Sequence, residues 1–152
     1  MTTEALLAYA HFLAILTMTV FLASEAALCR KEWLNAAVVE RLARVDMIYG
    51  ISALVVLITG VARTYWGMKG VGWYWSQPLL HLKVTLFVVI ALMSIGPTVR
   101  FMRWRRNLRS SGALPSDVEI RNVRRLVMIE AHLLALIPIL AVFLARGVAV
   151  SS

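Results

Sequence analysis

Four long blocks of apolar residues constrain this chain more than any other feature of its sequence. Each block is long enough, or nearly so, for a helix that crosses the hydrocarbon core of a bilayer, which takes about 20 residues. The blocks are too long for strands, and they lack the period-two alternation of a membrane β-barrel. The sequence therefore predicts an all-α fold, an integral membrane four-helix bundle that forms a single domain over residues 1–152. The predicted helices cover about residues 5–29, 46–66, 79–99 and 122–146.

Positive charge lies between the apolar blocks rather than on one face of the chain. The net charge is +8, but four Lys and Arg residues fall within residues 30–46 and eight within residues 100–125. Basic residues concentrate in the cytoplasmic loops of membrane proteins, so the pattern predicts both loops in the cytoplasm and both termini outside (N-out/C-out). The predicted location is the bacterial cytoplasmic (inner) membrane, and the predicted partner of the basic loops is the lipid bilayer rather than nucleic acid.

Three ionisable residues are predicted to share the outer half of the membrane. His11 lies about six residues in from the outer end of the first helix, while His81 and Lys83 lie in the first turns of the third helix. Ionisable groups inside a spanning helix are costly and are often functional. Two imidazoles on separate helices at one depth are typical axial ligands of a haem iron. The sequence therefore predicts haem b with His11 and His81 as metal ligands, unless both only bond hydroxyl or carbonyl groups between helices.

The carboxylates of a haem need cationic partners close to the interface. Arg63, Lys69 and Lys83 are the candidates on the outer side, and Arg63 joins the histidines as a predicted cofactor-binding residue. Cys29 is the only cysteine, which excludes both a CxxCH haem attachment and a disulfide within the chain. The predicted haem is therefore bound without a covalent bond to cysteine.

A second layer of polar residues is predicted in the inner half of the membrane. Glu25 ends the first helix, Asp46 opens the second, and Glu130 and His132 lie near the inner end of the fourth. Glu25, Asp46 and His132 are candidates for a proton relay or a second metal or cofactor site, with His132 as its cofactor-binding residue. The alternative is that the acidic groups pair with the nearby basic residues at the membrane surface, reaching it by snorkelling.

Several segments resemble a bacterial family known only as a predicted membrane domain of unknown function. The resemblance covers nearly the whole chain and implies a membrane location, but it implies no activity. The segments that carry it are Glu4–Ala14, Arg41–Gly50, Gly67–Gly70 and Pro97–Arg105.

A shorter likeness involves the HemJ type of protoporphyrinogen oxidase, a small haem-binding membrane protein of about four helices. The segment Leu80-His81-Leu82-Lys83-Val84 is similar to the motif that opens a later HemJ helix, and His11 stands where the first HemJ helix carries a histidine. The likeness implies that His11 is an axial haem ligand and that Lys83 is a catalytic residue. The first helix departs from HemJ at Ala23-Ser-Glu25-Ala, where HemJ has Gly-Leu and Pro-Arg features.

Three functions follow from these residues as hypotheses. The first is a membrane b-type haem protein that transfers electrons, for example with a quinone, or that oxidises a porphyrin-like substrate. The second is a small proton- or cation-coupled transporter or channel that uses Glu25, Asp46 and His132. The third is an accessory membrane subunit without a cofactor. Four helices barely enclose a porphyrin, so each hypothesis also allows a homodimer.

Overall fold

Four long helices form the structure, a computed structural model that describes residues 2–67 and 69–146. The described residues contain helices and no strand. A short helix, α3 (Val71–Ser76), lies between the second and third long helices. The long helices are all apolar enough to cross a membrane, which confirms the predicted four-helix membrane bundle. They are α1 (Thr2–Leu28), α2 (Ala36–Trp66), α4 (Pro78–Ser111) and α5 (Asp117–Ala145).

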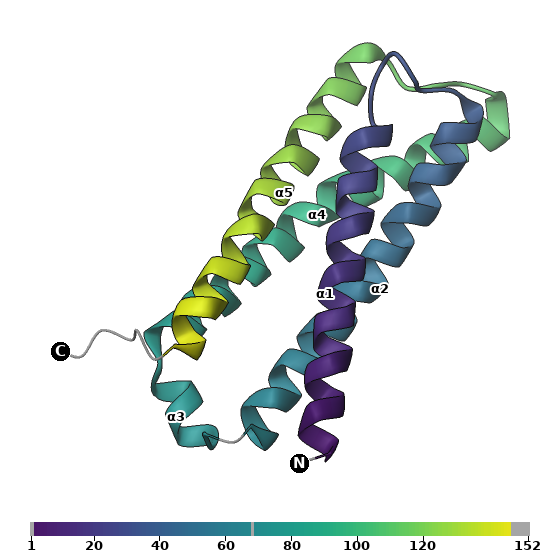
Figure 1. Cartoon of the computed structure of the whole chain (residues 1–152). Coiled ribbons are helices and arrows are strands. Elements are labelled where there is room, and N and C mark those ends of the chain that lie inside the picture. The colour runs from purple at the N-terminus through teal and green to yellow at the C-terminus, as the bar shows by residue number, and fades with distance from the viewer. Residues whose placement is uncertain (1, 68, 147–152) are drawn as a thin grey trace.

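The bundle is built from two pairs of helices. Helix α1 packs mainly against α2, and α4 packs mainly against α5, while contacts of α2 with α4 and of α1 with α5 join the pairs (Figure 1). Helix α1 begins and α5 ends at the same end of the bundle as α3, which we call the terminal end. The opposite end, which carries residues 29–35 and 112–116, is the loop end. An even number of spans returns the chain to one side, as predicted; which side faces the cytoplasm stays a prediction.

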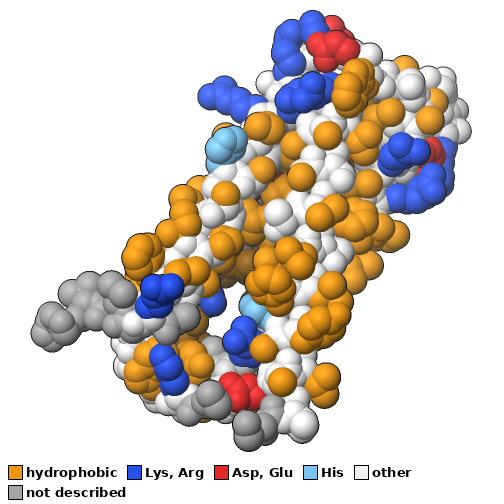
Figure 2. Space-filling model, in the orientation of Figure 1, with side chains coloured by type: hydrophobic (Ala, Val, Ile, Leu, Met, Phe, Trp, Pro, Cys, Tyr) orange, Lys and Arg blue, Asp and Glu red, His pale blue; other side chains and the backbone are white. Residues whose placement is uncertain are grey.

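The long helices turn large apolar side chains outward over the middle of the bundle. Examples on three helices are Leu16, Leu54, Ile58 and Leu92, all of which are exposed. Figure 2 shows hydrophobic side chains over the middle of the visible face, with Lys and Arg gathered toward the two ends. An apolar belt between charged ends matches a bilayer and its headgroups, so these side chains contact lipid.

The two basic loops are much shorter than predicted. Helix α2 begins at Ala36 rather than near residue 46, and the side chain of Asn35 caps it by accepting a hydrogen bond from the Val38 N–H (3.0 Å). Helix α4 continues to Ser111 rather than stopping near residue 99, and it ends at Gly112, whose φ of 70° is left-handed. Hydropathy locates only the part of a helix that crosses the membrane. A helix continues beyond that part wherever one face is still buried.

The helix extensions at the loop end have a core of their own. Leu42, Phe101, Trp104 and Val123 are fully or almost fully buried there, and the Phe101 and Trp104 rings meet edge to face with centroids 5.5 Å apart. Arginines between these positions on α4 face outward, among them Arg103. Alternation of buried apolar and exposed basic residues is the pattern of a helix in water, so the loop end stands out of the hydrocarbon core.

A capping box formed by Ser116 and Glu119 starts α5. The Ser116 hydroxyl accepts a hydrogen bond from the Glu119 N–H (3.3 Å), and the Glu119 carboxylate accepts one from the Ser116 N–H (3.1 Å). Two N–H groups at the helix start are thereby satisfied. The capping box fixes where α5 begins, directly after the short connection from α4.

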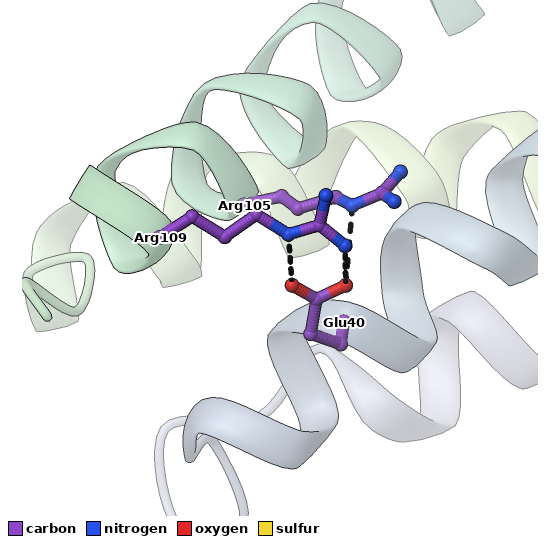
Figure 3. Close-up of polar contacts among 3 residues, drawn as sticks. All are labelled: Glu40, Arg105 and Arg109. Carbon is purple, nitrogen blue, oxygen red and sulfur yellow. Dashed lines mark hydrogen bonds and ion pairs between the residues drawn. The ribbon is translucent and has the colours of Figure 1, made fainter.

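A carboxylate on α2 clamps two arginines of α4 at the loop end. Arg109 donates two hydrogen bonds to Glu40, from Nε to Oε1 (2.7 Å) and from Nη2 to Oε2 (2.9 Å) (Figure 3). The Nε of Arg105 lies 3.1 Å from Glu40 Oε2. Bidentate pairing fixes both partners in one geometry. The clamp therefore sets the position of α2 along α4.

Replacing Glu40 by glutamine is expected to lower the melting temperature slightly, by about 1–3 °C, because exposed ion pairs contribute little. The difference from the wild type should shrink in about 1 M salt, where the Debye length falls to ~3 Å. Thermal unfolding of the purified protein at low and high salt measures both effects. A difference that is as large in high salt as in low salt would contradict an electrostatic origin.

Candidate functional site

A cavity of about 320 Å³ lies between the helices at the terminal end. It takes His11 from α1, Arg63 from α2 and Lys83 from α4, all three of them predicted site residues. The volume falls within the range of about 300–1,000 Å³ that is typical of small-molecule sites. Figure 2 shows the molecule hollowed at this end, with basic side chains and a histidine at the rim. The structure thus brings most of the predicted outer site together.

A hydrogen bond to a threonine sets the tautomer of the His11 ring, that is, which ring nitrogen carries the proton. The His11 Nδ1 lies 2.8 Å from the Thr59 Oγ1. The Thr59 hydroxyl has a single proton and donates it to the Val55 carbonyl (2.6 Å), so at His11 it accepts a hydrogen bond instead. The proton of the neutral imidazole therefore lies on Nδ1, and Nε2 keeps its lone pair. This is the form in which a histidine binds a metal through Nε2 while its other nitrogen is anchored.

The His11 ring packs closely against α2 at Gly60, where there is no side chain. A Cβ atom at this position would lie 3.2 Å from His11 Cε1, which is tighter than an ordinary contact. Gly60 also lines the cavity, one residue along α2 from Thr59. The close approach of the ring to the helix backbone therefore depends on the absence of a side chain.

Three basic side chains line the same cavity: Arg63, Lys69 and Lys83. The described residues that line it include no acidic side chain. Like charges that converge on one space repel each other, and an anion placed between them relieves that repulsion. The cavity is therefore suited to a ligand that carries negative charge.

Helix α3 closes the cavity with aromatic side chains. Trp73 and Tyr74 line it, and the Lys69 ammonium lies 4.0 Å from the centre of the Trp73 ring. Tyr74 packs on the backbone at Gly67, where a Cβ atom would come within 2.6 Å of the tyrosine ring. The turn after α2 thus needs glycine so that α3 can fold back over the cavity. Aromatic walls beside cations suit a flat anionic molecule.

The structure does not bring His81 into the cavity. His81 is exposed, and its Nε2 donates a hydrogen bond to the Trp75 carbonyl (2.8 Å), a group that only accepts. Lys83 does line the cavity. Residues two apart on a helix point about 200° away from each other, so His81 and Lys83 face different sides of α4. The two-residue spacing in the sequence already indicated this separation. The prediction missed it because it compared only depth in the membrane, and depth does not fix the face of a helix.

His132 also lies apart from its predicted neighbours. The ring is exposed, and its Nδ1 donates to the Met128 carbonyl of its own helix (2.6 Å). Glu130, two residues earlier, is only 1% exposed and faces the bundle interior with Glu25 and Asp46. His132 therefore does not form a second cofactor site with the other residues predicted for the inner half of the membrane.

The inner acidic residues form a buried cluster rather than a set of surface ion pairs. Glu25, Asp46 and Glu130 are all buried, and they lie close enough to interact electrostatically. The ion pairs found among the described residues involve Glu40, not these three carboxyl groups. The alternative that they pair with basic residues at the surface is therefore wrong, because their side chains point into the bundle.

Sequence reasoning missed the residues that shape the cavity rather than charge it. Thr59 and Gly60 drew no attention because a threonine and a glycine are ordinary in membrane helices. Their signal was periodicity: Gly60 and Arg63 are three residues apart and Thr59 and Arg63 four apart, so the three share one face of α2. Pairing that face with His11 needed the packing of α1 on α2, which the sequence does not specify.

Comparisons with known proteins extend the picture to nearly the whole chain. A family of membrane proteins is matched from the start of α1 to beyond the end of α5, which agrees with the resemblance noted in four segments of the sequence. Its description gives a membrane location and no ligand or activity. Searches among curated proteins and among solved structures find no match. The chain belongs to the family described as predicted membrane protein (DUF2214), whose model matches residues 3–149.

Proposed function

We propose that this protein binds a b-type haem, or a closely related metalloporphyrin, in the cavity at the terminal end of the bundle. The observation that carries the proposal is the His11 ring, which lines a cationic cavity and is held through Nδ1 by Thr59. A histidine anchored in this way is prepared to bind iron through Nε2.

The other cavity residues supply the kinds of group that a haem needs, namely cations and aromatic rings. Arg63 and Lys83 would pair with the propionate groups, since guanidinium and ammonium groups are the usual partners of carboxylates. Trp73 and Tyr74 would pack against the porphyrin. A bound haem would supply one-electron redox chemistry, while the residues of this chain orient the ring and neutralise its negative charge.

The position of His81 bears on the kind of chemistry. His81 would have to give up its bond to the Trp75 carbonyl before it served as a second ligand. Among the described residues that line the cavity, His11 is the only histidine, so a bound haem would have one histidine ligand from this chain and would be open to another molecule. Such a site would suit oxidation of a small substrate, including a porphyrin-like one, with an external electron acceptor such as a quinone taking up the electrons, better than electron transfer alone.

An absorption spectrum of protein purified from haem-replete cells tests the proposal. We expect a Soret band in the wild type, its loss in His11→Ala, and its retention in His81→Ala. The matched control is His132→Ala, which removes an exposed histidine outside the cavity. A Soret band that is absent from the wild type, or that survives His11→Ala unchanged, would overturn the proposal.

A milder variant separates the anchoring of His11 from its presence. Thr59→Val keeps the shape of the side chain and removes the hydroxyl that accepts from His11 Nδ1. Loss of such an anchoring partner typically weakens metal binding about 10- to 100-fold. Titration of the haem-free protein with haemin measures the change, and an unchanged affinity would show that Thr59 does not hold the ligand.

A further inference from the structure

A second site lies near the other end of the bundle, toward the loop end, and does not depend on the proposed haem. We propose that Glu25, Asp46 and Glu130 form a proton-binding site, in which neighbouring buried carboxyl groups take up protons inside the bundle. The three come from different helices, α1, α2 and α5, and so the site exists only in the folded bundle.

All three carboxyl groups are buried in the bundle. Glu25 and Glu130 are each 1% exposed and Asp46 is 5% exposed, so water does not reach the carboxyl groups. Glu25 interacts electrostatically with both of the others, which also interact with each other. Three ionised carboxylates in one dry space would repel each other without the screening that water provides. Protonation removes the charge, as in carboxyl pairs that share a proton.

The hydrogen bonds of the three carboxyl groups are incomplete. One oxygen of Glu25 and one of Glu130 are buried without any hydrogen-bond partner. A carboxylate oxygen left in this way is unfavourable, because it has lost its water and gained nothing. Donors reach two of the three groups at other oxygens: the Thr98 hydroxyl donates to Asp46 Oδ1 (2.8 Å), and the Tyr49 hydroxyl is hydrogen-bonded to Glu130. Proton uptake is therefore most favourable at Glu25 and Glu130, each of which keeps an oxygen without a donor.

The remaining neighbours are weak acids rather than bases. The Tyr49 hydroxyl faces Glu130 and also lies near Glu25 and Asp46, and the buried Cys29 thiol lies near Glu25. Arg124 on α5 interacts electrostatically with the Cys29 thiol. None of the ion pairs found among the described residues involves the three carboxyl groups. Without a paired cation, protons are the means by which the cluster loses charge.

A metal ion is a poorer occupant of this space. No group of three or more His, Cys, Asp or Glu side chains within residues 2–67 and 69–146 is arranged to hold a metal ion. His132 does not join the cluster, because it faces outward. The carboxyl groups therefore face each other closely enough to interact but are not gathered around a common point, which suits protons passed between them.

The proton site is also separate from the cavity. Glu25 follows His11 by 14 residues on the same helix, a distance of about 21 Å along the helix axis. No residue of the cluster lines the cavity. The two sites can therefore be tested independently.

Infrared spectroscopy of the purified, haem-free protein tests the proposal directly. A protonated carboxyl group has a C=O stretching band that a carboxylate lacks. We expect this band at neutral pH in the wild type and its loss as the pH is raised. Glu25→Gln and Glu130→Gln should each remove one carboxyl group's share of it, because glutamine keeps the side-chain shape. The matched control is Glu40→Gln, which removes an exposed carboxylate paired with arginine and should leave the band unchanged.

Three outcomes would overturn the proposal. The wild type would lack the band at neutral pH, or both glutamine variants would show the band unchanged from the wild type, or added divalent cations would abolish it until a chelator is supplied. The last would identify a cation site. If one variant does not fold, as judged by size exclusion and circular dichroism, the other variant and the pH titration of the wild type still decide. Because haem is absent throughout, failure here leaves the proposed function standing.

Discussion

Gly60→Leu is expected to weaken ligand binding in the cavity roughly five- to 150-fold. The new side chain would begin at a Cβ only 3.2 Å from His11 Cε1, so the imidazole would have to move away from Thr59. Forcing extra atoms into a packed site typically costs about 1–3 kcal/mol, which corresponds to that range of affinity. Haemin titration of the haem-free variant and of the wild type gives the ratio.

Gly50→Leu is the matched control for this prediction. Gly50 lies on the same helix, but a Cβ atom there would meet nothing within 4 Å. Both substitutions raise the helix propensity of α2 by about 0.8–1.0 kcal/mol, so neither is expected to unfold it. Equal affinities in the two variants would show that the space beside His11 does not matter for binding.

The sequence was sufficient for the architecture because lipid imposes a simple rule on length and polarity. Every backbone group in the hydrocarbon core must be bonded within the protein, which leaves helices as the solution for long apolar blocks. The sequence therefore predicted the number of long helices correctly, and it also predicted that the start of α1 and the end of α5 lie at one end of the bundle. The extensions of α2 and α4 did not follow, because their arginine-rich sequences hide a buried face formed by Leu42, Phe101 and Trp104.

The candidate site was predictable in its charges and not in its pairing. Depth along each helix correctly brought His11, Arg63 and Lys83 to one level, and they line one cavity. Depth alone cannot distinguish His81 from Lys83, because residues two apart share a level and face opposite sides. The same geometry separates Glu130 from His132 on α5. The rotation of each helix is set by packing against its neighbours, and that information is spread over the whole bundle.

Phe101→Ala is expected to destabilise the protein by about 3–5 kcal/mol, the largest effect on stability among these predictions. The Phe101 side chain is 0% exposed and packs edge to face against Trp104, where α4 leaves the membrane. Within lipid, truncating an apolar side chain forfeits packing but little transfer free energy, since lipid is as apolar as the protein interior. At the loop end water surrounds the core, so both terms apply.

Met102→Ala separates this core from the mere presence of apolar residues on α4. Met102 is the next residue along the helix and is 63% exposed, so its truncation should change the free energy of unfolding by less than about 0.5 kcal/mol. Denaturant titration of both variants in one detergent gives the two values. Similar values would mean that the loop end has no water-excluding core and that the clamp at Glu40 alone holds α2 to α4. A large effect confined to Phe101→Ala would show that the arginine-rich end of α4 is helical because one of its faces is buried. That burial would explain why α4 continues as far as Ser111.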